Sequence, residues 1–293
     1  MSSAPMILYQ VYYDDRRPFN VHEASSTILE SMVRSRFIGR VSTTPAEHLC
    51  LRPISNLAAR TTVSKIKCNQ NVLQRLSDPH GRDLILVVNT HASPHDGGLL
   101  YGDKKTTGLE TIINHIVGEQ SPASHFRKTA LFLLCCGGFA QHSLSELRDA
   151  SKHFSAVFAF GAPILDPVLI MSQFVTSVVD YFVMGQEDLW STIRYSVKQE
   201  VIKHTSIFVG QGGDIFKVCD ASWRSRPNGE EVRCCQHPAK YHGTDGGGKI
   251  KFRCRAAGHI GSRTFRIEPL PEVGGFRMFL GKRGGPRYMI CKC

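Results

Sequence analysis

Two uninterrupted apolar runs constrain the fold of this chain more than any other feature. Residues 84–88 (LILVV) and 131–134 (LFLL) contain no polar side chain, as expected for strands that are covered on both faces. Between them, apolar residues recur on one side of a helical pattern at Leu109, Ile112 and Ile116. A buried strand, a helix and a second buried strand in this order are typical of a parallel sheet flanked by helices.

The first two thirds of the chain continue this alternation. Strand patterns are predicted at residues 6–13, 48–54, 156–160 and 206–209, and helix patterns at 28–37 and 62–76. Residues 78–81 (DPHG) predict a turn. Capping boxes at Thr107–Glu110 and Ser143–Glu146 predict two helix starts. Asp166 and Pro167 predict the start of a helix towards residue 183, and a last helix is expected through residues 193–201. The sequence therefore predicts an α/β domain.

Charge and cysteine content divide the chain into two parts. Residues 215–293 hold 16 Lys and Arg against 6 Asp and Glu, which is +10 of the formal net charge of +11. The same stretch holds six of the ten cysteines. We expect a nearly neutral α/β domain at residues 1–213 and a small, basic, β-rich, Cys/His-rich module at residues 214–293.

Two strand ends carry side chains that are suited to chemistry. His91 follows the run at 84–88, and Cys135 and Cys136 follow the run at 131–134. The reactive groups of such sheets sit at the carboxyl ends of the strands, so an imidazole and a thiol meet there if the two strands are neighbours. Cys and His together perform nucleophilic acyl transfer, and the amides of Ala92 and Cys136 would stabilise the oxyanion. We expect Gly137 and Gly138 to let a substrate backbone come close.

These residues resemble the caspase-like cysteine peptidases, and the branch with CHAT domains most of all. The resemblance rests on a strand followed by His91, the segment GGLLYGD at residues 97–103, a helix, and a strand followed by Cys and Gly. The His-to-Cys separation of 45 residues and the stretch 156–182 are also similar to that family. The resemblance covers residues 6–210.

The resemblance implies a caspase-like three-layer sandwich and a cysteine endopeptidase that cuts proteins or peptides through a thioester. Cys136 would be the nucleophile and His91 the general base, with Cys135 packed inward. Two positions depart from the family: Ala92 replaces the usual glycine, and Leu134 replaces an acidic residue of metacaspases. The family's loop after the first strand often lines the P1 pocket, and here that loop holds Asp14, Asp15, Arg16 and Arg17, so the P1 preference stays open.

Other interpretations of the same residues remain. A single His at a strand end is more often structural than catalytic, and a buried Cys is usually inert. His95 and His142 are alternative bases near the same edge. If neither His91 nor Cys136 is catalytic, the chain would instead be a catalytically inactive caspase-like scaffold whose basic tail, which could carry zinc, binds nucleic acid or a protein partner.

The basic module suggests a metal site. Cys234 with His237 and Cys254 with His259 form two pairs with spacings that suit tetrahedral Zn²⁺, and Cys235 and His242 are further candidate ligands. A structural zinc is expected there, with no cofactor for catalysis. Unligated thiols in a small β-rich unit are the alternative interpretation.

Charge indicates the partners of this module. Its cations would attract nucleic acid or acidic protein surfaces, and Trp223, Tyr241 and Phe252 lie near them in sequence and could stack on bases. The first ten residues do not match a signal peptide, which favours an intracellular, cytoplasmic or nuclear location. The longest apolar stretch, near residues 168–184, is interrupted by polar residues, so we expect no membrane partner.

Overall fold

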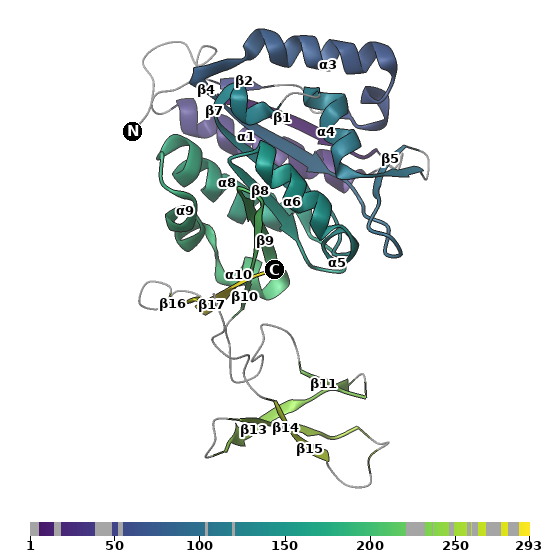
Figure 1. Cartoon of the computed structure of the whole chain (residues 1–293), viewed down its shortest axis with the longest axis vertical. Coiled ribbons are helices and arrows are strands. Elements are labelled where there is room, and N and C mark those ends of the chain that lie inside the picture. The colour runs from purple at the N-terminus through teal and green to yellow at the C-terminus, as the bar shows by residue number, and fades with distance from the viewer. Residues whose placement is uncertain are drawn as a thin grey trace. The chain divides into compact units, whose positions relative to one another are not determined.

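The chain divides into two compact units, Met1–Ile215 and Phe216–Cys293 (Figure 1). The computed structural model describes residues 6–14, 19–38, 49–51, 55–102, 105–118, 121–220, 232–235, 237–245, 249–256, 259, 263–267, 277–280 and 287–293.

A mixed, mostly parallel sheet forms the centre of the first unit. Its strand order is β9-β8-β7-β4-β1-β2, and β3 also pairs with β1. Every neighbouring pair is parallel except β8 and β9. The strands are β1 (Met6–Tyr12), β2 (Leu49–Leu51), β3 (Ser55–Asn56), β4 (Asp78–Asn89), β7 (Phe126–Leu134), β8 (Ala156–Phe160) and β9 (Ile207–Gln211).

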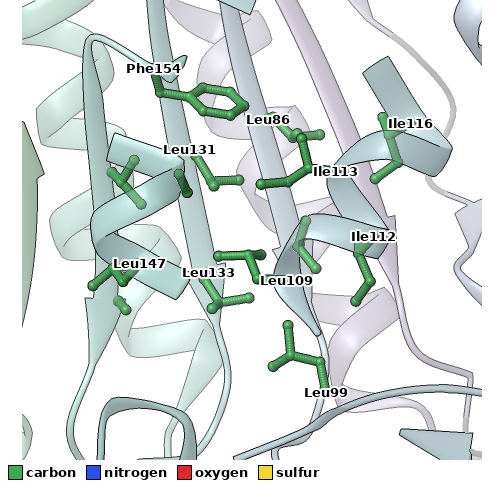
Figure 2. Packing of buried hydrophobic residues seen from close by; sticks show 14 of the residues in the cluster. Leu86, Leu99, Leu109, Ile112, Ile113, Ile116, Leu131, Leu133, Leu147 and Phe154 are labelled. Atoms are coloured by element: carbon green, nitrogen blue, oxygen red, sulfur yellow. The ribbon is translucent and has the colours of Figure 1, made fainter. Parts of the chain in front are cut away.

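Helices cover both faces of this sheet, which confirms the predicted α/β architecture. Helices α3 (Val63–Leu76), α4 (Leu109–Val117) and α6 (Leu144–His153) pack on one face. Figure 2 shows how Leu109, Ile112 and Ile113 of α4 meet Leu86 and Leu133 of the sheet. Successive side chains of a strand point to opposite faces of the sheet, and both faces are covered here, so these strands need continuous apolar runs. In β7, every side chain from Thr129 to Leu134 is buried.

The opposite face is covered by α1 (Val21–Ile38) and by the helical segment Pro167–Met184. This segment consists of α7 (Pro167–Leu169), η3 (Ile170–Val175), α8 (Thr176–Val178) and η4 (Val179–Met184), where η3 and η4 are π-helical. Phe174 packs edge-on against Phe158 and Phe160 of the sheet, and Phe158 stacks on Phe132 at 4.7 Å. Asp166 caps the segment through the amides of its first turn, as the sequence predicted.

By length and composition, Pro167–Met184 could cross a membrane, although the sequence suggested that no run reached that limit. The segment has 18 mostly apolar residues, and just over half of it is buried inside the protein. A core helix of an α/β domain passes the same test, because its apolar residues face the sheet.

Three local predictions were wrong. Neither capping box forms: the N-cap of α4 is Gly108 and not Thr107, and the Glu146 carboxylate of α6 accepts the Leu109 amide of α4. The last predicted helix is two helices, α9 (Leu189–Ser196) and α10 (Gln199–His204). Residues 78–81, which read as a turn, belong to β4 at an irregularity in its pairing with β7.

The second unit consists of small antiparallel sheets, as expected for a β-rich module. Strand β10 (Asp214–Asp220), which crosses the unit boundary, pairs antiparallel with β17 (Arg287–Lys292), and β17 pairs antiparallel with β16 (Arg277–Leu280). The other sheets are the hairpin of β11 (Arg233–Cys234) and β12 (His237–Pro238), and the sheet of β13 (Lys240–Thr244), β14 (Ile250–Cys254) and β15 (Arg263–Ile267). Their core among the described residues is small: Val232, Ile250 and Phe252, with Ala239 and Phe265 packed against it.

Candidate functional site

The register of two central strands brings the predicted catalytic residues to one edge of the sheet. Strands β4 and β7 are parallel neighbours, and Asn89 pairs with Leu134 at their carboxyl ends. His91 and Cys136 each lie two residues beyond that pair. The Thr90 amide donates to the Leu134 carbonyl at 2.9 Å, which continues the pairing towards His91.

The two adjacent cysteines have different environments. Cys135 is 1% exposed and belongs to the hydrophobic core. Burial, and to a lesser degree the neighbouring Cys136, raises the pKa of the Cys135 thiol well above its usual value. Cys136 is partly exposed. Since the thiolate is the nucleophilic form, the environment favours Cys136 as the reactive residue of the two.

The two glycines after Cys136 allow other backbone segments of the protein to approach closely. A Cβ on Gly137 would lie 2.3 Å from the Gly161 carbonyl oxygen, and one on Gly138 would lie 2.6 Å from the Ser93 carbonyl oxygen. The loops that follow β4, β7 and β8 therefore meet at Gly137 and Gly138, with no space there for a side chain. We expected these glycines to admit a substrate backbone, but the protein's own backbone occupies the space beside them.

A buried polar network contacts His91, and it was not predicted from the sequence. His22 of α1 is 5% exposed, and its Nε2 lies 3.1 Å from Nε2 of His91. The other ring nitrogen of His22, Nδ1, lies 2.7 Å from Oδ1 of the fully buried Asn89. The rings of His22 and Tyr13 both approach His91 edge-on, with centroids at 4.5 and 6.0 Å.

The start of α1 fixes the position of His22. Asn20 caps the helix, since its Oδ1 accepts the amides of His22 at 3.0 Å and Glu23 at 3.3 Å. The Asn20 side chain also donates to the Tyr13 carbonyl at the end of β1. The spacing of Asn20 and Glu23 resembles a capping box, a signal that could have placed His22 in a first helical turn beside the sheet edge.

The segment after His91 folds back as a short hairpin. Ala92 forms an antiparallel bridge with Leu99, and the Leu100 amide donates to the His91 carbonyl at 2.9 Å. Strands β5 (Leu99–Gly102) and β6 (Lys105–Thr107) then pair with each other. The alternative bases His95 and His142 are both exposed.

The predicted specificity loop is described only in part. The Asp14 carboxylate accepts hydrogen bonds from Asn20 and Asn56, while Asp15, Arg16 and Arg17 lie outside the described residues. Two cavities of about 350 and 500 Å³ are lined by neither His91 nor Cys136. The first adjoins Ser77 and Phe126, where β4 and β7 begin, so it lies at the opposite edge of the sheet.

In the second unit, a cluster of four side chains could hold a metal ion. The ligand atoms of Cys234, Cys235, Cys254 and His259 all lie within 4.8 Å of one another. The Cys235 sulfur lies 3.7 Å from each of the other two sulfurs, and His259 Nε2 lies 3.4 Å from the Cys234 sulfur and 2.7 Å from that of Cys235. The Ala256 amide, the largest influence, lowers the pKa of Cys254 and so favours its thiolate.

Three of the four predicted ligands, Cys234, Cys254 and His259, lie in this cluster. His237 does not join the cluster, because its Nδ1 bonds the Cys235 carbonyl at 2.8 Å, and Cys235 takes its place. Cys235 has a positive φ of 45°, which turns the chain after Cys234. The exposed His242 is not in the cluster either.

Comparison with known proteins adds no assignment. No protein-family model matches the chain, and no curated protein matches it at a significant level. Inferences about its function therefore depend on its own residues and their geometry.

Proposed function

We propose that the first unit is a caspase-like cysteine endopeptidase, with Cys136 as nucleophile and His91 as general base. The observation that carries this proposal is the register of β4 and β7, which brings His91 and Cys136 to the same edge at the same height. The burial of Cys135 supports Cys136 as the reactive thiol.

The reaction follows from the chemistry of the two groups. His91 takes the proton of the Cys136 thiol, and the sulfur adds to the carbonyl carbon of a peptide bond. The backbone amides of Ala92 and Cys136 are the proposed donors to the oxyanion. Collapse of this intermediate breaks the C–N bond, the amine leaves with the proton from His91, and a thioester remains. Water activated by His91 then hydrolyses the thioester and frees the thiol.

Labelling with a peptidyl acyloxymethyl ketone library tests this proposal, because the library covers many P1 residues. We expect one label per chain, on Cys136, which Cys136→Ala abolishes and His91→Ala strongly reduces. Cys68→Ala is the matched control, since Cys68 is an exposed free thiol on α3. If no member labels the chain, or if Cys136→Ala labels as the wild type does, the inactive-scaffold alternative is favoured.

We also propose that the second unit holds a structural Zn²⁺ at Cys234, Cys235, Cys254 and His259. A tetrahedron with Zn–S bonds of about 2.3 Å and a Zn–N bond of about 2.0 Å has edges of about 3.8 Å between sulfurs and about 3.5 Å between sulfur and nitrogen. The S···S separations of 3.7 Å and one S···N separation of 3.4 Å are close to these values. The small core of the strands β11 to β15 is the reason that this part of the chain would need a metal.

Metal analysis of the purified full chain tests the zinc site. We expect about one Zn per chain, lost in Cys235→Ser and in Cys254→Ser. His237→Ala is the matched control and should retain the metal, because His237 lies outside the cluster. Less than half a Zn per chain, or loss of metal in His237→Ala alone, would contradict the proposed ligands.

A second candidate function is binding of nucleic acid by the outer face of the β13-β14-β15 sheet. Lys240 pairs directly with Arg253, and Lys251 pairs directly with Arg266. Like charges directly opposite each other destabilise a sheet, so they favour a polyanionic partner. Asp245 forms an ion pair with Arg266 at 3.1 Å, and the face stays basic.

The aromatic residues do not support base stacking. Phe252 is fully buried, and Tyr241 pairs with Phe252 on the opposite face from Lys251. Trp223 lies outside the described residues. The face therefore suits the phosphate backbone of a duplex rather than unstacked bases.

Fluorescence anisotropy with a labelled random duplex, over a series of salt concentrations, tests this function. Replacement of Lys240 and Lys251 by Gln should weaken binding and lower the slope of log K against log[salt] by about two. Replacement of Lys65 and Lys67, two exposed lysines of α3, is the matched control. Equal affinities for both double variants would exclude this face, and binding of acidic proteins alone would assign it to another class of partner.

A further inference from the structure

We infer that His22 is a positioning residue that sets the tautomer of His91. This inference rests on the proposed peptidase function for its catalytic meaning, but it can be tested without any activity. Its basis is the chain of contacts that runs from Asn89 through His22 to His91.

The orientation of the Asn89 amide is fixed by its neighbours. Its Nδ2 lies 3.1 Å from the His22 carbonyl oxygen and 2.9 Å from Ser25 Oγ. A carbonyl oxygen only accepts, so the Asn89 nitrogen must face it as the donor. Ser25 Oγ itself donates to the same carbonyl at 3.0 Å, so it is able to accept from Asn89. The Asn89 oxygen is therefore the atom that faces His22.

This orientation determines the protonation of both histidines. Since Asn89 Oδ1 is an acceptor, Nδ1 of His22 must carry a proton and donate across the 2.7 Å contact. Nε2 of a neutral His22 is then an acceptor. The His91 nitrogen at 3.1 Å, Nε2, must be the donor. Nδ1 of neutral His91 is left without a proton, and it is the basic nitrogen of the ring.

The surroundings of His22 favour its neutral form. Its ring is buried, and it lies in the first turn of an 18-residue helix, where the helix dipole disfavours a positive charge. Among the described residues, no third metal-ligating side chain gathers with these two imidazoles, so a hydrogen bond accounts for the contact better than a shared cation does.

The arrangement gives His22 a part in the proposed reaction. When Nδ1 of His91 takes the proton of the Cys136 thiol, His91 becomes an imidazolium whose Nε2–H still donates to His22. A hydrogen bond from a charged donor is stronger than one from a neutral donor, so the contact strengthens as the charge forms. Asn89 and His22 together would hold the His91 imidazole in one tautomer and orientation and stabilise its imidazolium form, as a buried hydrogen-bond acceptor does for the catalytic histidine of other enzymes.

Histidine ¹⁵N NMR of the full chain tests the tautomers directly. We expect the Nδ1–H form for His22 and the Nε2–H form for His91 in the wild type, assigned with single His variants. The result for His22 is the more informative of the two, because free neutral imidazole prefers the Nε2–H form. An Nε2–H form of His22, or an Nδ1–H form of His91, would overturn the inference whether or not the chain is a peptidase.

The rate of Cys136 labelling separates positioning from mere structural support. His22→Leu removes the acceptor and should slow labelling by about 10- to 100-fold, since general-base catalysis contributes about 10²–10⁴. His22→Gln can place its carbonyl oxygen near the former Nε2 and should retain the rate within about threefold. His153→Leu, at an exposed histidine of α6, is the control.

The outcomes distinguish the two proposals. If both His22 variants lose labelling equally while circular dichroism shows them folded, the acceptor is not what matters and the inference fails. If the wild type shows the expected tautomers but no labelling, the peptidase proposal fails and the tautomer assignment stands.

Discussion

Replacement of Gly137 by Ala tests how tightly the loops around Cys136 are packed. The added Cβ would lie 2.3 Å from the Gly161 carbonyl oxygen, where ordinary contact begins at 3.4 Å. The two loops must therefore separate by roughly 1 Å. Gly161 resists this movement because its amide bonds the Ser206 carbonyl and the Thr205 hydroxyl, both at 3.0 Å. The Gly137 amide is itself held by the Ala162 carbonyl at 2.7 Å.

The expected cost follows from these contacts. Loss of the buried Gly137–Ala162 hydrogen bond costs about 1–3 kcal/mol. Forcing extra volume into a packed site costs about 1–3 kcal/mol as well. Because one loop movement relieves part of both, we expect a loss of about 3 kcal/mol in the free energy of unfolding. A displacement of about 1 Å at Cys136 would also slow its reaction with a peptidyl ketone by about 100-fold.

Urea unfolding and labelling kinetics measure the two effects. Gly212→Ala is the matched control, because Gly212 has a positive φ of 59° but nothing within 4 Å of its Cβ position. It should lose about 1 kcal/mol, from backbone strain alone, with normal labelling. If Gly137→Ala loses no more stability than Gly212→Ala, the close packing of these loops does not govern the site as we argue.

Two further predictions concern the sheet. Arg127→Met removes the two contacts of 2.6 and 2.9 Å that Arg127 makes with the buried Asp83 carboxylate, and should lower the free energy of unfolding by about 3 kcal/mol. Lys152→Met removes an exposed ion pair and should change the free energy of unfolding by under about 0.5 kcal/mol. Urea unfolding compares the two variants, and equal losses would contradict this account. Burial, and then Glu23, raises the pKa of Tyr12 above its usual value of about 10, so the folded chain keeps a proton that the unfolded chain loses. The stability that depends on protonated Tyr12 is fully present below about pH 10 and is lost as the pH rises through the higher folded pKa. The free energy of unfolding of Tyr12→Phe should therefore fall less steeply above about pH 10 than that of the wild type. Stability measured over a pH titration tests this, and identical profiles would refute the assignment.

Burial on both faces made the central strands predictable. A continuous apolar run such as residues 84–88 fits a covered strand, and the order of strands and helices then favours a mainly parallel sheet. The rule that reactive groups follow strand ends placed His91 and Cys136, and the structure brings their two strands together.

Contacts between distant segments could not be predicted in this way. The Leu109 amide is capped by Glu146 of another helix, although Glu110 stood at the spacing of a local capping box. His22 is 67 residues from Asn89 in sequence, and the two become neighbours because β1, which precedes α1, pairs with β4 and the start of α1 lies at the end of β4. A single sequence gives local spacing, whereas both of these partners are chosen by tertiary packing.

The ligand set of the metal cluster shows the same limit on a shorter scale. The spacing of Cys234 and His237 suggested a chelating pair, and the two residues are indeed cross-strand partners in the β11–β12 hairpin. However, the Cys235 carbonyl engages His237 Nδ1, and the positive φ of Cys235 directs its own thiol towards Cys254 instead. For a non-glycine residue that backbone conformation is unfavourable, so something must compensate for it. A metal bond to the Cys235 thiolate would provide that compensation, which is why Cys235→Ser should lose the metal while His237→Ala keeps it.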